Sequence, residues 1–420
     1  MTPPSDLRID VDRLCQRLEA LGEIGTVRGD NGELGCARLA LTPADGQGRD
    51  LVLSWMRDLG LAVVVDGIGN VFATRAGTDV GAAPVMTGSH IDTVRTGGRF
   101  DGNLGVLAGL EVIETLEQHG VVTTRPICVA FFTNEEGARF QPDMLGSLVH
   151  VGGLALEVAL DVRAVDDGAR LGDELAAIGY VGTMPCPAAS SPYAFVELHI
   201  EQGPILEREG ITIGAVTGVQ GISWTEVTIT GQSAHAGTTP MNMRHDPGYA
   251  AAAVAVGVRT ISADMGGTQV ATVGRCEFRP NLVNVVNASA TITVDLRNTD
   301  EELLQEAERR FIQLCDDLEA AEGVSITRST LARFEPVQFD SAMIDLVEAT
   351  ASQLAHSTRR MPSGAGHDAQ MLARVCPTSM VFVQSHNGLS HNIAEYTAPH
   401  HLEAGANVLL QVMLAKANEV

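Results

Sequence analysis

Lysine is almost absent from this sequence, which contains only Lys416 among its 420 residues. A P-loop requires a lysine within G-x-x-x-x-G-K, and a Schiff-base mechanism requires a lysine placed in the active site. The sequence also lacks the G-x-S-x-G pattern of the nucleophile elbow. These absences argue against P-loop nucleotide-binding proteins, Schiff-base enzymes and hydrolases with a serine elbow.

Positive charge is scarce in general. The chain carries 28 lysine and arginine residues against 52 aspartate and glutamate residues, which gives a formal net charge of −24 at pH 7. A nucleic-acid partner or an anionic membrane surface would require a basic patch on the protein. We therefore expect no nucleic-acid partner and no membrane partner.

Long apolar runs and paired cysteine motifs are missing as well. No apolar run approaches the roughly 18 residues that a membrane span needs, and the alanine-rich run at 249–258 predicts a packed helix instead. The seven cysteines are scattered without a C-x-x-C motif, and the N-terminus lacks a basic-then-apolar signal pattern. We therefore expect reduced thiols and a cytoplasmic location.

What the chain does have is an alternation of short apolar runs and amphipathic segments. The runs at 61–66, 70–77 and 83–90 predict strands of a central sheet, and the apolar run at 126–133 predicts a strand buried on both faces. A helix is expected at 105–120, where apolar residues recur at helical spacing. This alternation predicts an α/β layered unit.

The sequence pattern changes after about residue 217. Segments 224–231 and 290–300 alternate between apolar and polar residues, which predicts half-exposed strands. Helices are expected between and after them. We therefore predict a discontinuous α/β/α catalytic domain, residues 1–217 and 332–420, with an inserted α+β domain of ferredoxin-like type at 218–331.

Histidine and carboxylate residues follow several of the apolar runs. They are His90, Asp92, Asp101, Glu135, Glu136, His199 and His391. Polar residues at the ends of neighbouring strands converge at one edge of a sheet, where α/β proteins bind ligands. Three imidazoles with carboxylates and no thiolate suit zinc, manganese, cobalt or nickel. Each residue alone is also explained as a satisfied polar strand end, a turn former or a solvated loop, so spacing leaves both interpretations open.

Several longer motifs resemble one family. They are "GSHIDTV", "GGRFDGNLGVLAGLE", "TNEEGARF", "ELHIEQGP", "QSAHAGTTPM", "NVVN…DLR", "GAGHDA" and "SHN…EYT". Together they are similar to the hydantoinase/carbamoylase amidases, a branch of the M20 dinuclear metallopeptidase superfamily. The motifs occur in family order from about residue 20 to the end. "NEEGARF" and "HAGTTPM" are specific to this branch.

The resemblance implies two divalent metal ions per subunit, with zinc expected in a crystal and manganese, cobalt or nickel as alternatives. His90 and His199 would bind one ion, Glu136 and His391 the other, and Asp101 would bridge them. Glu135 would then be the general base. Asp92 would orient a ligating imidazole.

The resemblance also implies substrate contacts and a homodimer formed through the inserted lid domain. Arg297 would bind the substrate carboxylate, and His235 would reach into the site of the partner subunit to stabilise the developing oxyanion. Further matching substrate positions are Gln220, Asn284 and Gly366, while the neighbouring His367 and Asp368 are explained equally well as structural or catalytic.

The expected function is metal-dependent hydrolysis of the linear C–N bond of an N-carbamoyl-L-amino acid or related ureido acid, a small-molecule substrate. Two alternatives lie close to it: allantoate hydrolysis, and an M20-type deacylase or peptidase acting on N-acyl amino acids. A non-catalytic binding protein on the same scaffold would lack a ligand or Glu135, and the sequence keeps all of them.

Overall fold

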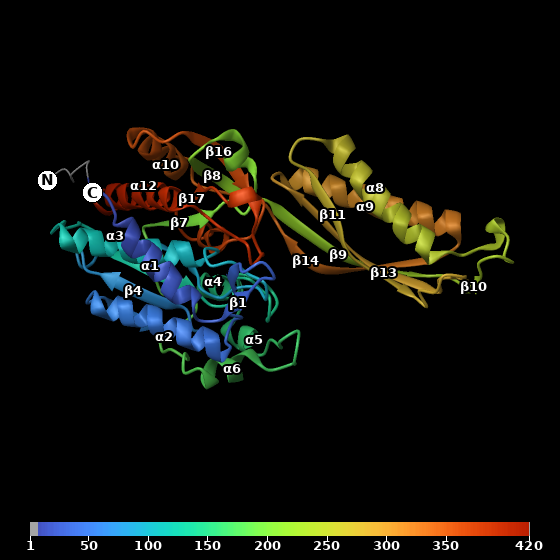
Figure 1. Ribbon diagram of the computed structural model, residues 1–420, viewed down its shortest axis with the longest axis horizontal. Helices are drawn as coiled ribbons and strands as arrows, with labels where there is room; N and C mark the ends of the chain where they lie inside the picture. The colour runs from blue at the N-terminus through green and yellow to red at the C-terminus, as the bar shows by residue number, and fades with distance from the viewer. Residues whose placement is uncertain (1–6, 420) are drawn as a thin grey trace. The chain divides into compact units, whose positions relative to one another are not determined.

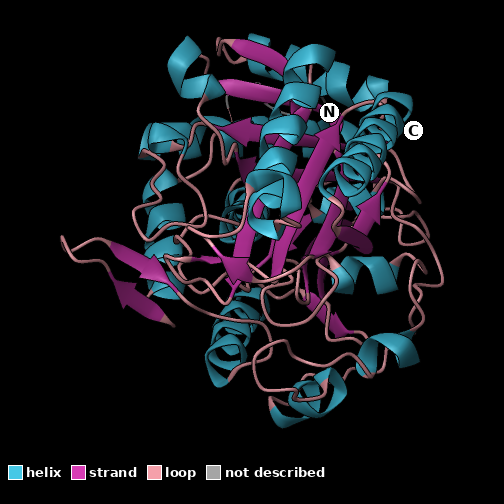
Figure 2. Ribbon diagram, turned by 90° about the vertical axis from the view of Figure 1, so that its right-hand side faces the viewer, coloured by secondary structure: helices cyan, strands magenta, loops and turns pink. Residues whose placement is uncertain are grey.

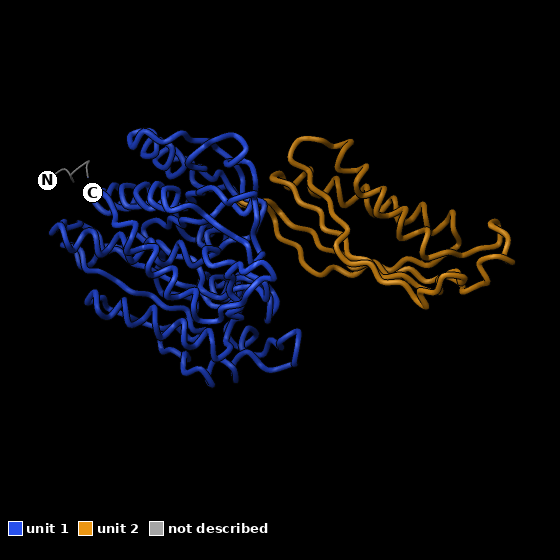
Figure 3. The backbone as a smooth tube through the Cα atoms, viewed as in Figure 1, with its two compact units in different colours: residues 1–218, 338–420 blue, residues 219–337 orange. Residues whose placement is uncertain are grey.

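A computed structural model describes residues 7–419 of the chain. Residues 1–6 lie outside this range, so the part of the N-terminus that was considered for a signal pattern falls partly outside the described residues. The chain forms two compact units, one of residues 1–218 and 338–420 and the other of residues 219–337 (Figure 3). The first unit is therefore discontinuous in sequence, because the second is inserted into it.

A nine-stranded mixed sheet forms the centre of the first unit (Figure 2). In spatial order its strands are β15 (Val337–Gln338), β8 (Ile213–Val219), β17 (Thr378–Val383), β7 (Ala194–Ile200), β5 (Val85–His90), β6 (Ile127–Phe132), β4 (Val71–Arg75) and β3 (Ala62–Val65), with β16 (Thr358–Ser363) paired to β8. Every residue of β5, β6, β7 and β17 is buried, as expected for strands covered on both faces.

The first unit also contains helices, most of which are labelled in Figure 1. They are α1 (Val11–Gly22), α2 (Pro43–Asp58), α3 (Asn103–Gln118), α4 (Leu145–His150), α5 (Leu156–Leu160), α6 (Leu171–Ala177), α7 (Ile205–Glu209), α10 (Ser341–Gln353), α11 (Asp368–Leu372) and α12 (Pro399–Ala417). The α3 and α12 helices pack on each other and on β5 and β7. The α/β class predicted from the sequence is confirmed. None of the described helices combines the length and hydropathy that a bilayer span requires.

The second unit is a four-stranded antiparallel sheet with two long helices. Its elements are β9 (Gly221–Thr230), β10 (Ala234–His235), α8 (Pro247–Met265), β11 (Val270–Arg279), β12 (Val285–Val286), β13 (Ser289–Asn298), α9 (Glu301–Glu322) and β14 (Ser325–Phe334). The sheet order is β11-β13-β9-β14, and the chain order of the long elements is the β-α-β-β-α-β of ferredoxin-like folds.

One face of this sheet builds the core of the second unit. Ile292, Val294 and Leu296 of β13 are buried, as their alternation predicted, and they join apolar residues of α8 and α9 in one cluster. The strands β11 and β14 are not among the elements predicted from the sequence. The second unit includes β14 and ends at Val337, whereas the boundary predicted from the sequence is residue 331.

Candidate active site

Four neighbouring parallel strands bring the predicted donors to one edge of the large sheet. The β17, β7, β5 and β6 strands lie side by side and run in the same direction. His90 is the last residue of β5, and His199 is the last but one of β7. Glu135 and Glu136 follow the end of β6, and His391 follows β17. Because parallel strands end at the same edge, residues distant in sequence become neighbours there.

Asp101 lies at the centre of this group, in the turn that leads into α3. Its Oδ1 is 3.6 Å from Nε2 of His90 and 3.1 Å from Nε2 of His199. Its Oδ2 is 3.6 Å from Nε2 of His391, which in turn lies 3.1 Å from Oε2 of Glu136. The result is two sets of donors that share one carboxylate: His90, Asp101 and His199 in one, and Asp101, Glu136 and His391 in the other.

Hydrogen bonds fix the orientation of the two buried imidazoles. Nδ1 of His90 lies 2.9 Å from the main-chain oxygen of Asp92, and Nδ1 of His199 lies 2.9 Å from that of Ile200. Because a carbonyl oxygen only accepts, each Nδ1 carries the hydrogen and each Nε2 is directed at Asp101. A histidine that ligates a metal commonly has this arrangement, with the outer ring nitrogen donating to a carbonyl.

The charges of the cluster fit a bound cation. Burial alone would lower the pKa of His90, but Glu135 and Asp101 outweigh it and raise that pKa well above its usual value. Burial would likewise raise the pKa of Asp101, but His199 and His90 hold it well below its usual range. The carboxylates thus favour positive charge between them, which a proton supplies in the metal-free chain and a divalent ion can supply instead.

His391 differs from the other two histidines in its exposure. Its side chain is 52% exposed, whereas those of His90 and His199 are almost fully buried. The hydrogen bond to Glu136 raises the pKa of His391 to about 9, against the smaller opposing effect of its partial burial. The second set of donors is therefore open to solvent on one side.

Glu135 lies beside the cluster without belonging to either set of donors. Its side chain is buried, and its Oε2 is 3.3 Å from Nε2 of His90. Burial raises the pKa of Glu135 well above its usual value, even though His90 lowers it. A buried carboxylate of this kind can hold and transfer a proton.

Asp92 holds the bend in which Glu135 and Glu136 lie. Both main-chain amides donate to the Asp92 carboxylate, at 3.2 Å and 3.3 Å. The family resemblance implies that this carboxylate orients an imidazole. In the structure the main-chain oxygen of Asp92 contacts Nδ1 of His90, while its carboxylate lies 3.8 Å from the same nitrogen.

Three residues around Asp101 were not identified from the sequence. Gln202 Nε2 and Ser390 Oγ both donate to Oδ2 of Asp101, at 2.8 Å and 3.0 Å. Oε1 of Glu395 accepts the main-chain amides of Phe100 and Asp101, at 3.0 Å and 3.1 Å. Gln202 and Glu395 occur inside the motifs "ELHIEQGP" and "EYT", so the motifs were the available signal, but their spacing indicates no contact with Asp101.

Gly366 lies in the first unit, between β16 and α11. A Cβ at this position would come within 2.8 Å of Cε of Met144, so a side chain would displace its neighbour. The adjacent His367 is buried, with Nε2 2.8 Å from Oγ of Ser363. Its ring packs edge-on against His199, with centroids 4.6 Å apart. His367 therefore supports a predicted ligand through packing.

The other predicted substrate residues lie in the second unit and form two pairs. Gln220 directly precedes β9, and Arg297 lies in β13 opposite Ile222. His235 belongs to β10, next to Asn284, whose main-chain oxygen accepts the amide of Ala236 at 2.9 Å.

The two pairs lie at opposite ends of the β9–β13 ladder. Its register runs from Asn298 opposite Gly221 to Ser289 opposite Thr230. At a rise of about 3.4 Å per residue, the eight steps from Arg297 to Ser289 span about 27 Å. The pairs are therefore too far apart within one copy of this unit to contact the same small molecule.

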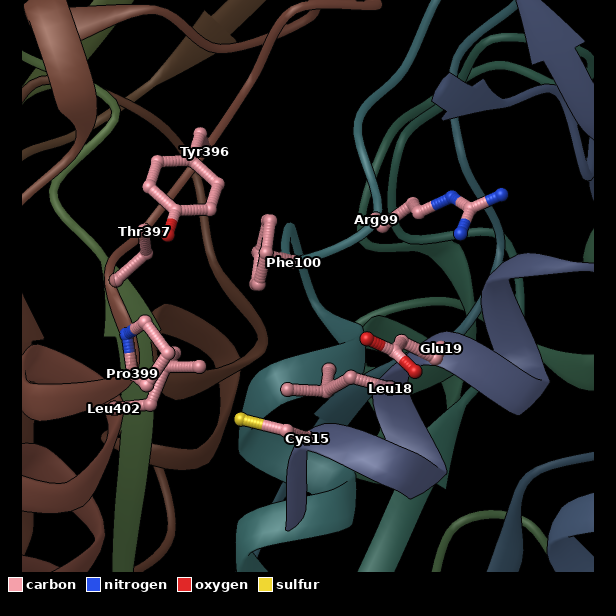
Figure 4. A pocket seen from close by; sticks show the side chains of 9 residues that line it. All are labelled: Cys15, Leu18, Glu19, Arg99, Phe100, Tyr396, Thr397, Pro399 and Leu402. Atoms are coloured by element: carbon pink, nitrogen blue, oxygen red, sulfur yellow. The ribbon is translucent and has the colours of Figure 1, made fainter. Parts of the chain in front are cut away.

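An apolar cavity is lined in part by Arg99 and Phe100, which directly precede Asp101 in the same loop (Figure 4). Its lining includes Cys15 and Leu18 of α1, together with Phe100, Tyr396 and Leu402. None of the predicted ligand or substrate residues lines it, so it is separate from the donor cluster.

Comparisons with known proteins agree with this geometry. Residues 86–415 match the model of peptidase family M20/M25/M40. The chain is 42% identical to the N-carbamoyl-L-amino-acid amidohydrolase of Rhizobium meliloti over 100% of this chain and 99% of that protein. It is 36% identical to the allantoate amidohydrolase of Escherichia coli K12, over 89% and 91% of the two chains.

A solved structure extends the comparison to three dimensions. The amidase of the hydantoinase/carbamoylase family from Burkholderia multivorans superposes with a TM-score of 0.92, at 45% identity, over 98% of this chain and 99% of that one. The likeness covers both units, in sequence as well as in structure. This chain belongs to peptidase family M20/M25/M40 and, within it, to the hydantoinase/carbamoylase amidases.

Proposed function

We propose that this chain hydrolyses the linear C–N bond of an N-carbamoyl-L-amino acid or a related ureido acid, using two divalent metal ions. The observation that carries the proposal is the pair of donor sets that share Asp101, with Glu135 beside them and outside both. The relatives named above, which act on N-carbamoyl-L-amino acids and allantoate, support the same substrate class.

The donors fit zinc, manganese, cobalt or nickel, since all are imidazole nitrogens and carboxylate oxygens. His90 and His199 would hold one ion, Glu136 and His391 the other, and Asp101 would bridge them. Two ions in such a site polarise the substrate carbonyl and lower the pKa of a water molecule. Gln202 and Ser390 hold the bridging carboxylate in place through its Oδ2.

Glu135 then serves as the proton carrier. It accepts a proton from the attacking water and delivers it to the amino-acid nitrogen as the C–N bond breaks. Water adds to the carbamoyl carbon, and the products are the amino acid and carbamic acid, which breaks down to carbon dioxide and ammonia. The turn held by Asp92 keeps the Glu135 carboxylate beside His90 while the Glu136 side chain faces His391.

Arg297 binds the substrate carboxylate. Asp295 fixes the plane of its guanidinium group through Nε and Nη2, at 3.1 Å and 2.9 Å, and the group lies over the Trp224 ring at 5.8 Å. A guanidinium group held in this way is prepared for a planar carboxylate. Gln220 lies at the same end of the ladder and contacts the same part of the substrate, and Gly366 is a further substrate contact.

The active form is a homodimer in which His235 and Asn284 act on the partner's substrate. The support is the separation of about 27 Å between their end of the β9–β13 ladder and Arg297, since one small substrate cannot reach both ends of one copy. His235 Nδ1 accepts the amides of Gly237 and Thr238, so Nε2 carries the hydrogen and can donate to an oxyanion. All seven cysteines are unpaired, which supports a cytoplasmic location.

A turnover panel on metal-loaded enzyme tests this function. The panel comprises N-carbamoyl-L- and N-carbamoyl-D-amino acids, N-carbamoyl-β-alanine, allantoate and N-acetyl-L-amino acids, with ammonia or acetate release as the assay. We expect the highest kcat/KM for an N-carbamoyl-L-amino acid or another ureido acid. A preference for N-acetyl substrates would overturn the proposal and favour a deacylase.

A further inference from the structure

Arg38 is a fully buried cation that contacts residues next to two of the predicted ligands. Arg38 has no exposed surface and lies outside every motif that the sequence analysis singled out. Its guanidinium group donates to four neutral oxygen atoms, three main-chain carbonyls and one side-chain amide, and to the Cys36 sulfur at 3.3 Å. Arginine stays protonated in proteins, so these contacts must compensate for a permanent buried charge.

Two of these contacts join the segments that carry predicted ligands. Nε of Arg38 donates to the main-chain oxygen of Ile91 at 2.8 Å, directly after His90. Nη2 donates to Oδ1 of Asn103 at 2.7 Å, two residues after Asp101. The guanidinium group therefore bridges the end of β5, which carries His90, and the start of α3, which follows the turn that carries Asp101.

The remaining contacts anchor Arg38 to the body of the first unit. Nη1 donates to the main-chain oxygens of Leu21 and Ile24, at 2.8 Å and 2.9 Å, at the carboxyl end of α1, where the helix dipole favours a positive charge. The main chain of Arg38 exchanges hydrogen bonds with Thr93, at 2.7 Å and 2.9 Å.

The buried side chain of Glu395 holds the same loop by accepting hydrogen bonds from two of the loop's main-chain amides. Glu395 is 5% exposed, and its Oε1 accepts the amides of Phe100 and Asp101. The Phe100 side chain meanwhile points into the apolar cavity (Figure 4). Residues 91–103 are thus held at both ends of the loop. The Arg38 guanidinium group donates to a carbonyl and a side-chain amide oxygen, and the Glu395 carboxyl group accepts two main-chain amides.

We propose that Arg38 is a positioning residue for the metal centre: its guanidinium group fixes residues 91–103 so that His90 and Asp101 face one ion. The inference rests on the proposed metal-dependent function. Lysine cannot replace arginine here, because one ammonium group cannot reach Ile91, Asn103 and α1 in three directions at once. Loss of the bridge leaves both donors in the chain but frees their relative position.

The test is cobalt binding to the full-length protein after chelator treatment, followed by metal analysis and the visible absorption of bound Co²⁺. The variant is Arg38→Lys. The control is Arg125→Lys, since the partly buried Arg125 precedes β6, at the opposite end of that strand from Glu135, with its guanidinium group 3.6 Å from the centroid of the Tyr193 ring. Thermal unfolding of each protein establishes that it is folded.

We expect Arg38→Lys to bind Co²⁺ roughly 10- to 100-fold more weakly, with an altered absorption spectrum, as is common when a residue supporting a metal ligand is changed. Arg125→Lys should bind as the wild type does. Wild-type affinity and spectrum in Arg38→Lys would overturn the inference, whereas a wild-type protein that takes up no Co²⁺ would overturn the proposed function itself.

A second variant covers the case in which Arg38→Lys does not fold. Asn103→Ala leaves the cation in place and removes its contact next to Asp101, together with the Asn103 Nδ2 hydrogen bond to the main-chain oxygen of Arg99 at 3.2 Å. We expect weaker Co²⁺ binding and a shifted spectrum in this variant also. A folded Asn103→Ala with wild-type binding and spectrum would count against the positioning role.

Discussion

The two adjacent carboxylates Glu135 and Glu136 should respond differently to the same substitution. Glu136 shares a set of donors with His391, at 3.1 Å, whereas Glu135 is buried beside His90 and lies outside both sets. Glutamine keeps the size of each side chain and removes its charge. The pair therefore provides two matched variants that differ by one position in the chain.

Glu135→Gln should keep both metal ions and lose turnover. An amide cannot accept the proton of the attacking water, and removing a general base costs about 10²- to 10⁴-fold in rate, or roughly 3 to 5.5 kcal/mol of barrier. Because Glu135 contributes to neither set of donors, the metal content should stay at about two ions per chain.

Glu136→Gln should lose one of the two ions. The second set of donors has only Glu136 and His391 besides the shared Asp101, and His391 is half exposed. An amide oxygen is a weaker ligand than a carboxylate for these metals, so the content should fall toward about one ion per chain, and turnover should fall with it.

The assay combines elemental analysis after gel filtration with kcat on an N-carbamoyl-L-amino acid. Thermal unfolding of both variants serves as the control for folding. The reasoning is refuted if Glu135→Gln loses an ion, or if Glu136→Gln keeps both ions while Glu135→Gln keeps full activity.

Three further predictions concern the substrate, the dimer and the metal. Arg297→Lys should raise KM about 10- to 100-fold without changing metal content, because lysine cannot bind a carboxylate in bidentate fashion; an unchanged KM would contradict the assignment. His235→Ala should lose about 10²- to 10³-fold in kcat, and mixing it with Glu135→Gln subunits should restore activity through hybrid dimers; mixtures as inactive as their parents would exclude a role in the partner's site. Metal uptake at pH 7 should release protons, because His90 and the His391 imidazole, whose pKa is about 9, are protonated in the metal-free chain. Affinity should accordingly rise as pH approaches 9, and calorimetry in two buffers of different ionisation enthalpy should detect the release; its absence would contradict the assigned donors.

The parts of the fold that were predictable are those with a strong local pattern. The buried strand β6 is a continuous apolar run, ICVAFF, and β13 alternates cleanly, so the sequence pattern identified them. The strands β11 and β14 were missed because most of their residues are exposed and their sequences are polar, as in "VATVGRCEFR" and "SITRSTLARF". Their pairing with β13 and β9 is set by contacts distant in sequence.

The same distinction applies to the site. The predicted donors all follow apolar runs or lie in family motifs, which made them visible in the sequence. The residues that hold these donors were not visible, because their contacts are long-range. Gln202 forms a hydrogen bond with Asp101, 101 positions away in the sequence, and Arg38 forms one with Asn103, 65 positions away. No spacing rule links such pairs, since only the packed sheet brings them together.

The central claim is that Asp101 is shared by two metal ions. Anomalous scattering from crystals of the zinc-loaded protein, with data collected on both sides of the zinc absorption edge, tests this claim most directly. We expect two peaks in the difference map, one beside His90 and His199 and the other beside Glu136 and His391, with both in contact with the Asp101 carboxylate. A single peak, or two peaks of which one lies away from Asp101, would contradict the account.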